Sequence, residues 1–151
     1  MTYHTQILLE YMLTLAAGIA ILYFIPKDDR QDVIGTALVV SGSMLFITID
    51  LWCNFDLSEL GYQYACQIPI IAEYNLVFSL GIDGISLVLL ALTVFIMPLC
   101  IISASSVETD TKKFIIYLLL IELFLIISFI TTNLFFFYIF FESVLIPMFI
   151  L

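Results

Sequence analysis

The sequence predicts an all-α membrane protein of about five transmembrane helices, with its N-terminus on the outside of the membrane. Hydrophobic residues make up 64% of the 151-residue chain and charged residues 11%, whereas a soluble domain is about half apolar and about a quarter charged. The apolar residues gather in five runs that are each near the ~20 residues a helix needs to cross a bilayer. The basic residues lie only in two of the connections between these runs.

The five apolar runs cover residues 6–25, 33–52, 85–103, 114–130 and 134–151. Backbone groups find no water partner in lipid, so each run should be a helix. Pro26 and the charges after it should end the first helix, and Trp52 lies where an interfacial anchor is expected. Asp83 and Ser86 are candidates for the N-cap of the third helix. The tight turn at residues 131–133 makes the fourth and fifth helices an antiparallel hairpin.

This reading divides the chain into three regions. Residues 1–53 form the first two transmembrane helices, and residues 85–151 form the last three. Residues 54–84 form a long loop on the outside. Within it, residues 62–70 and 74–80 have some strand character, which is compatible with a short β-hairpin.

The orientation follows from the basic residues. Lys27 and Arg30 lie in the first connection, and Lys112 and Lys113 lie in the connection before the fourth run. An even number of crossings separates these connections, so both fall on one side of the membrane. By the positive-inside rule that side is the inner one, which places the N-terminus outside and the C-terminus inside.

Charge and cysteine content exclude several classes of function. The net charge of −9 gives no basic surface for nucleic acid. Cys53, Cys66 and Cys100 form no CxxC pair, so we expect neither a metal site nor a bound cofactor. Cys53 and Cys66 could face the same compartment and pair, but two free thiols are the favoured reading. The first lysine follows the first apolar run, which argues against a removable targeting segment.

Two carboxylates inside predicted helices are the candidate functional groups. Glu122 and Glu142 each lie about 15 Å of helix from Thr132, which is half of a ~30 Å hydrocarbon core. A charge at that depth costs ~2.5–3.5 kcal/mol, and intramembrane carboxylates usually serve proton or ion transfer. We expect Glu142 to exchange protons. For Glu122 a protonated side chain bonded to a neighbour is an equally good reading. Glu10 and Asp50 lie near interfaces, where a surface role suffices.

Pro147 lies inside the fifth predicted helix, one turn after Ser143. Proline cannot donate a hydrogen bond to the Ser143 carbonyl. A tolerated kink is the ordinary explanation in a membrane helix. The alternative is a carbonyl freed to hold water beside Glu142. None of the five predicted helices contains a lysine, arginine or histidine. A cation that pairs with either glutamate must therefore come from another chain or from sequence outside these residues.

The chain has two recognisable stretches, residues 81–86 with 96–101 (GIDGIS and IMPLCI) and residues 137–149 (FYIFFESVLIPMF). The first is similar to the third-helix signature of NADH dehydrogenase subunit 4, and the second is closely similar to the fifth helix of that subunit. The chain therefore resembles the N-terminal part of subunit 4, a member of the antiporter-like subunit family related to Mrp-type sodium/proton antiporters. The likeness is specific over residues 79–151 and weak before them. It implies that Glu142 matches the family's pump residue and Glu122 its fourth-helix glutamate.

The resemblance also implies a role and a set of partners. The chain would be a non-redox subunit of a proton-translocating NADH:ubiquinone reductase, or complex I, and would bind no cofactor itself. Its partners would be other membrane-arm subunits and membrane lipids. Family members have about fourteen helices of spanning length, so we expect a separate polypeptide to supply the remaining helices and a lysine for Glu142.

The expected location is the mitochondrial inner membrane, with a bacterial plasma membrane as the alternative. Two other functions stay open at this stage. The chain could belong to an Mrp-type cation/proton antiporter, or it could be a purely structural fragment of the membrane arm.

Overall fold

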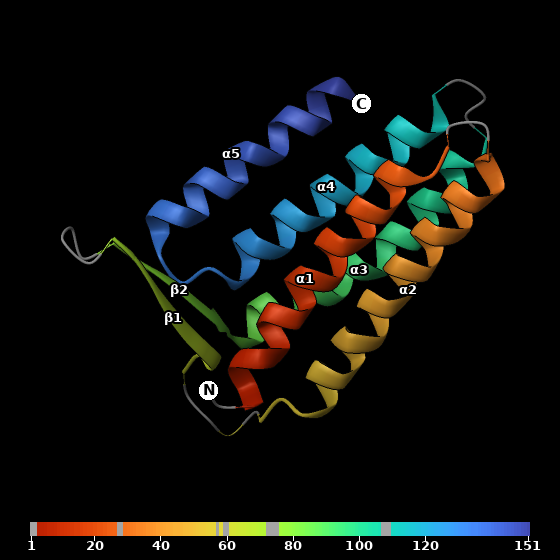
Figure 1. Ribbon diagram of the computed structural model, residues 1–151. Coiled ribbons are helices and arrows are strands. Elements are labelled where there is room, and N and C mark those ends of the chain that lie inside the picture. The colour runs from red at the N-terminus through yellow and green to blue at the C-terminus, as the bar shows by residue number, and fades with distance from the viewer. Residues whose placement is uncertain (1–2, 27–28, 57, 59–60, 72–75, 107–109) are drawn as a thin grey trace.

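The computed structural model describes residues 3–26, 29–56, 58, 61–71, 76–106 and 110–151. Within these residues the chain forms five α-helices and one two-stranded antiparallel sheet (Figure 1). The helices are α1 (Tyr3–Phe24), α2 (Arg30–Cys53), α3 (Gly84–Ala104), α4 (Thr111–Ile130) and α5 (Leu134–Ile150). The first four are long and apolar enough to cross a membrane, and α5 is a shorter apolar helix of 17 residues. The predicted all-α membrane fold is confirmed.

The start of α3 has the cap that the sequence predicts, and the start of α5 has a cap that the sequence analysis did not name. The Asp83 carboxylate accepts a hydrogen bond from the Ser86 backbone N–H at 2.7 Å and caps α3. Hydrogen bonds from the Ser86 side chain and backbone lower the pKa of Asp83. The Asn133 side chain caps α5 by accepting from the Phe135 N–H at 3.0 Å. Residues 131–133 therefore make the tight turn between α4 and α5.

The expectation that no basic residue lies within a helix is wrong. The observed α2 begins at Arg30, α4 contains Lys112 and Lys113, and α1 contains His4. These three helices begin about a turn before the apolar runs, because a polar terminal turn can lie in the membrane interface without leaving its side chains in hydrocarbon. These bases all lie near helix termini.

The helix termini that carry the basic residues meet at one end of the bundle. The Lys112 ammonium donates a hydrogen bond to the Tyr23 carbonyl at 2.9 Å and another to the Ile25 carbonyl. The Arg30 guanidinium donates to the Ser105 carbonyl. These bonds join α4 to the end of α1, and α2 to the end of α3. The first and third helix connections thus lie on the same side, as the sequence predicts. Lys27 lies outside the described residues.

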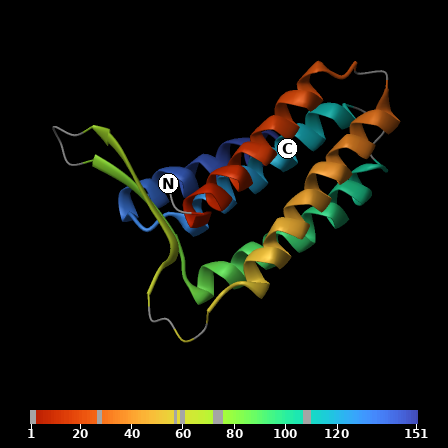
Figure 2. The same cartoon turned by 60° about the horizontal axis from the view of Figure 1, so that its bottom comes forward.

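The opposite end of the bundle carries the hairpin, β1 (Gln63–Ile71) and β2 (Leu76–Ile82) (Figure 2). β2 is tied to the turn between α4 and α5. The Thr132 N–H donates to the Ser79 carbonyl at 3.0 Å, and the hydroxyls of these two residues lie 2.7 Å apart. The Phe78 ring also packs against Phe136 of α5, with centroids 5.0 Å apart. β2 is therefore held against the helix pair that carries the two glutamates.

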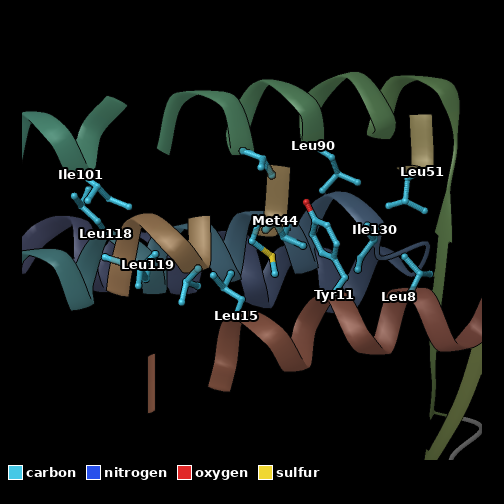
Figure 3. Close-up of a cluster of buried hydrophobic side chains, with 14 of the residues drawn as sticks. Leu8, Tyr11, Leu15, Met44, Leu51, Leu90, Ile101, Leu118, Leu119 and Ile130 are labelled. Carbon is cyan, nitrogen blue, oxygen red and sulfur yellow. The ribbon is translucent and has the colours of Figure 1, made fainter. Parts of the chain in front are cut away.

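The centre of the bundle is α4, which packs against α1, α2, α3 and α5. Tyr11 of α1, Met44 of α2 and Ile130 of α4 meet in one buried cluster (Figure 3). By contrast, α5 packs mainly against α4 and buries only Val144 and Pro147. Many large apolar side chains of α2, α3 and α5 point outward, which suits a surface covered by lipid or by other membrane segments.

Candidate functional site

Glu122 is a carboxylic acid in the core of the bundle. Its side chain is fully buried, at 0% exposure, on the central helix α4. Neither of its oxygens has a hydrogen-bond partner among the described residues. The nearest turns of α4 bury Leu118, Leu119 and Ile126 beside it. A charged carboxylate without partners in apolar surroundings is strongly disfavoured, so this site suits a group that carries a proton.

The neighbouring helices contribute one hydroxyl pair to the same core. The Tyr11 hydroxyl of α1 and the Thr48 hydroxyl of α2 are 2.7 Å apart, and both side chains are buried. Figure 3 shows the Tyr11 hydroxyl pointing from α1 into the cluster of buried side chains. Tyr11 and Glu122 lie at a similar height, each about 12 Å of helix rise from the hairpin end of the bundle, and their helices pack together. Sequence reasoning missed this pair because nothing in two apolar runs marks which of their side chains face each other.

Thr48 also lines an open pocket of about 240 Å³ between α2 and α3. The pocket wall is otherwise apolar and consists of Leu45, Ile49, Trp52, Ala91, Val94 and Phe95. Because it offers almost no polar surface, this pocket suits a lipid chain or an apolar side chain better than it suits an ion.

Glu142 has the opposite setting. It lies on the exposed face of α5, one turn after Tyr138, whose hydroxyl interacts with the Glu142 carboxylate. Ser143 does not reach it, because the Ser143 hydroxyl donates to the Ile139 carbonyl at 2.8 Å. The structure therefore does not bring Glu122 and Glu142 into one internal site. Glu122 faces the core, and Glu142 faces outward from the edge of the bundle.

The two glutamates nevertheless match in height along their helices. Glu122 lies about 12 Å of helix rise before the end of α4, and Glu142 about 12 Å after the start of α5. The tight turn joins these two ends, so both carboxylates lie well inside the bundle's length. Lys112 lies about 15 Å along α4 from Glu122, too far for an ion pair.

The remaining polar candidates lie at the surface. Glu10 and Asp50 are exposed, and the Asn54 side chain donates to Asp50 at 3.1 Å. Cys53, Cys66 and Cys100 are free thiols. Within the part of the chain that the structure describes, no three His, Cys, Asp or Glu side chains cluster as metal ligands would.

Comparison with known proteins gives a consistent set of relatives. The chain is 38% identical over 89% of its length to the NADH-ubiquinone oxidoreductase chain 4 of Arabidopsis thaliana. It is 38% identical over its full length to the protein of that name from the sea anemone Metridium senile. It is 35% identical over 95% of its length to the NADH-quinone oxidoreductase subunit M of Rickettsia felis. The chain spans 27–32% of the length of these relatives. No protein-family model matches it.

Proposed function

We propose that this chain, a homologue of NADH-ubiquinone oxidoreductase chain 4 and NADH-quinone oxidoreductase subunit M, forms part of the proton-translocating membrane arm of complex I. The observation that carries the proposal is the fully buried, unpartnered carboxyl group of Glu122. Intramembrane carboxylates are costly and mark proton or ion pathways. The chain would take no part in electron transfer, and NADH oxidation and quinone reduction would belong to other subunits.

Glu142 is the primary proton-exchanging group in this proposal. Its place on an exposed apolar face supports the presence of further helices there, because a carboxylate facing lipid alone would be poorly accommodated. We propose that helices outside these 151 residues cover α5 and bring a lysine within ~4–6 Å of Glu142. Lipids cover the other outward faces, and other membrane-arm subunits are the remaining partners. The expected location is the mitochondrial inner membrane.

Glu122 is the second proton-exchanging group. It lies on the helix next to Glu142 at a similar height, so a proton could pass between α4 and α5 without moving along the membrane normal. The protonation of the two glutamates would be controlled by different groups. Glu142 would respond to side chains of the helices that pack on α5, whereas Glu122 would respond to side chains within the bundle.

The test compares charge-neutralising variants in the assembled enzyme. Glu142→Gln should lower proton pumping and coupled turnover by roughly tenfold or more, as expected for loss of a proton-transfer group. Glu122→Gln should have a smaller effect. Glu10→Gln removes an exposed glutamate of α1 and is the matched control. Assembly is checked on native gels, and pumping is measured with a pH-sensitive dye in proteoliposomes.

Two outcomes would replace the proposal. A normal pumping stoichiometry in assembled Glu142→Gln enzyme would favour a purely structural role in the membrane arm. Co-purification of the chain with a larger homologue but without a flavin-bearing arm would favour an Mrp-type cation/proton antiporter.

A further inference from the structure

The core of the bundle holds a polar set that comes from three helices. Tyr11 of α1, Thr48 of α2 and Glu122 of α4 are 1%, 4% and 0% exposed. Each of these helices packs against the other two. Burying polar side chains is unfavourable unless they are satisfied, and here Tyr11 and Thr48 are bonded while Glu122 is not.

The direction of the hydrogen bond between Tyr11 and Thr48 follows from a second bond. The Thr48 hydroxyl donates to the Met44 carbonyl at 2.8 Å. A hydroxyl has one hydrogen to donate. The hydrogen between Tyr11 and Thr48 must therefore come from Tyr11. The hydrogen of the Tyr11 hydroxyl is therefore committed to α2 and is not donated to Glu122, whose carboxyl oxygens have no hydrogen-bond partner among the described residues.

This arrangement favours one protonation state of Glu122. A protonated carboxyl group tolerates a nearby acceptor, whereas an ionised one needs a donor or a cation. Tyr11 and Glu122 lie at a similar height, because each is about 12 Å of helix rise from the hairpin end of the bundle, and both side chains are buried on helices that pack together. The Tyr11 hydroxyl is thus a donor within the bundle that could stabilise a charge on Glu122.

We propose that Tyr11 is a positioning residue that couples the proton on Glu122 to the contact between α1 and α2. When Glu122 is protonated, the Tyr11 hydroxyl donates to Thr48 and ties α1 to α2. When Glu122 loses its proton, the hydroxyl turns toward the carboxylate and releases Thr48. The exchange is favourable because a hydrogen bond to an ionised group is stronger than a neutral one. This inference rests on the proposed function only in that Glu122 changes its protonation state.

Infrared difference spectra of the assembled complex, recorded on stepping the pH, test this coupling. The carboxyl C=O band of Glu122 is identified by its loss in Glu122→Gln, and the ring band of Tyr11 by its loss in Tyr11→Phe. We expect the Tyr11 band to change together with the Glu122 band, and this change to disappear in Glu122→Gln. Tyr11→Phe should shift the frequency of the Glu122 band while preserving the ring and its packing.

Substitutions at Thr48 separate orientation from packing. Thr48→Val removes the acceptor for Tyr11 and should shift the Glu122 band, and Thr48→Ser should restore it. Thr93→Val is the matched control, because Thr93 makes the same bond to the carbonyl one turn earlier, that of Leu89, on exposed surface. Tyr23→Phe controls for removal of an exposed tyrosine hydroxyl from α1.

A Tyr11 band that stays constant while the Glu122 band changes would overturn the coupling, even if Glu142→Gln abolishes pumping as proposed. A Glu122 band that never responds to pH would overturn both this inference and the proposed proton exchange at Glu122. Normal pumping in Glu142→Gln together with coupled bands would refute the proposed function alone.

Discussion

Gly18 of α1 lies close against Val40 of α2, and adding one methyl group at Gly18 should destabilise the bundle. An alanine Cβ would lie 2.6 Å from both Cγ atoms of Val40 and 3.1 Å from its Cβ. Rotation of Val40 about χ1 would still leave one methyl group in the way, and valine is stiff in a helix. The helices must separate, because ordinary contact begins near 3.4 Å. Overpacking of this kind costs about 1–3 kcal/mol.

The assay is unfolding of the chain in detergent by added SDS, followed by helical circular dichroism and by the fluorescence of Trp52, the single tryptophan. Gly42→Ala on α2 is the matched control, because its Cβ would meet nothing within 4 Å. Gly18→Ala should lower the free energy of unfolding by about 1–3 kcal/mol relative to that control. Val40→Ala in the same chain should recover part of the loss. Equal stability of Gly18→Ala and Gly42→Ala would refute the reasoning from close helix packing.

Two further predictions concern the ends of the bundle. Asp83→Ala should cost about 1 kcal/mol by removing the cap of α3. The pKa of Asp83 is lowered in the folded chain, so its contribution to the free energy of unfolding should be full at neutral pH and should vanish as the pH falls through that lowered pKa. Equal loss of stability in acid for Asp83→Ala and the parent chain would contradict this. With Cys66 and Cys100 replaced by serine, an impermeant thiol reagent should label exposed Cys53 only from the side opposite the basic residues. Labelling from the basic side would reverse the topology.

The helices of this chain were predictable because the bilayer imposes a simple rule. A run of about twenty apolar residues without a charge has few structures open to it other than a spanning helix. The cap at Asp83 follows from equally local chemistry, whereas Asn133 was predicted only as part of a turn and not as a cap. The starts of α2 and α4 were less well predicted. The helices were predicted from apolar runs, and the first turns of α2 and α4 contain the charged residues Arg30 and Lys112.

The direction in which each helix faces was not predictable from the pattern. In a soluble helix the polar face marks the outside, but a membrane helix is apolar on all sides, so its sequence does not tell a core face from a lipid face. Glu122 and Glu142 therefore looked alike, with Glu142 favoured. Only the packing of α4 at the centre and α5 at the edge separates them. The bond between Tyr11 and Thr48 was hidden for the same reason.

The two glutamates differ in their surroundings, and this difference suggests that they respond to different signals. A carboxyl group enclosed by its own chain can respond only to groups that the chain supplies, and we propose Tyr11 as that group for Glu122. A carboxyl group at the edge of the bundle responds to the helices that pack on it, and most of the α5 surface is open to such helices. A movement of those helices would therefore affect Glu142 first. It would reach Glu122 only through α4, which contacts every other helix. In the two proposals taken together, Glu142 would receive a signal from outside the chain, and Glu122 would pass it to the contact between α1 and α2.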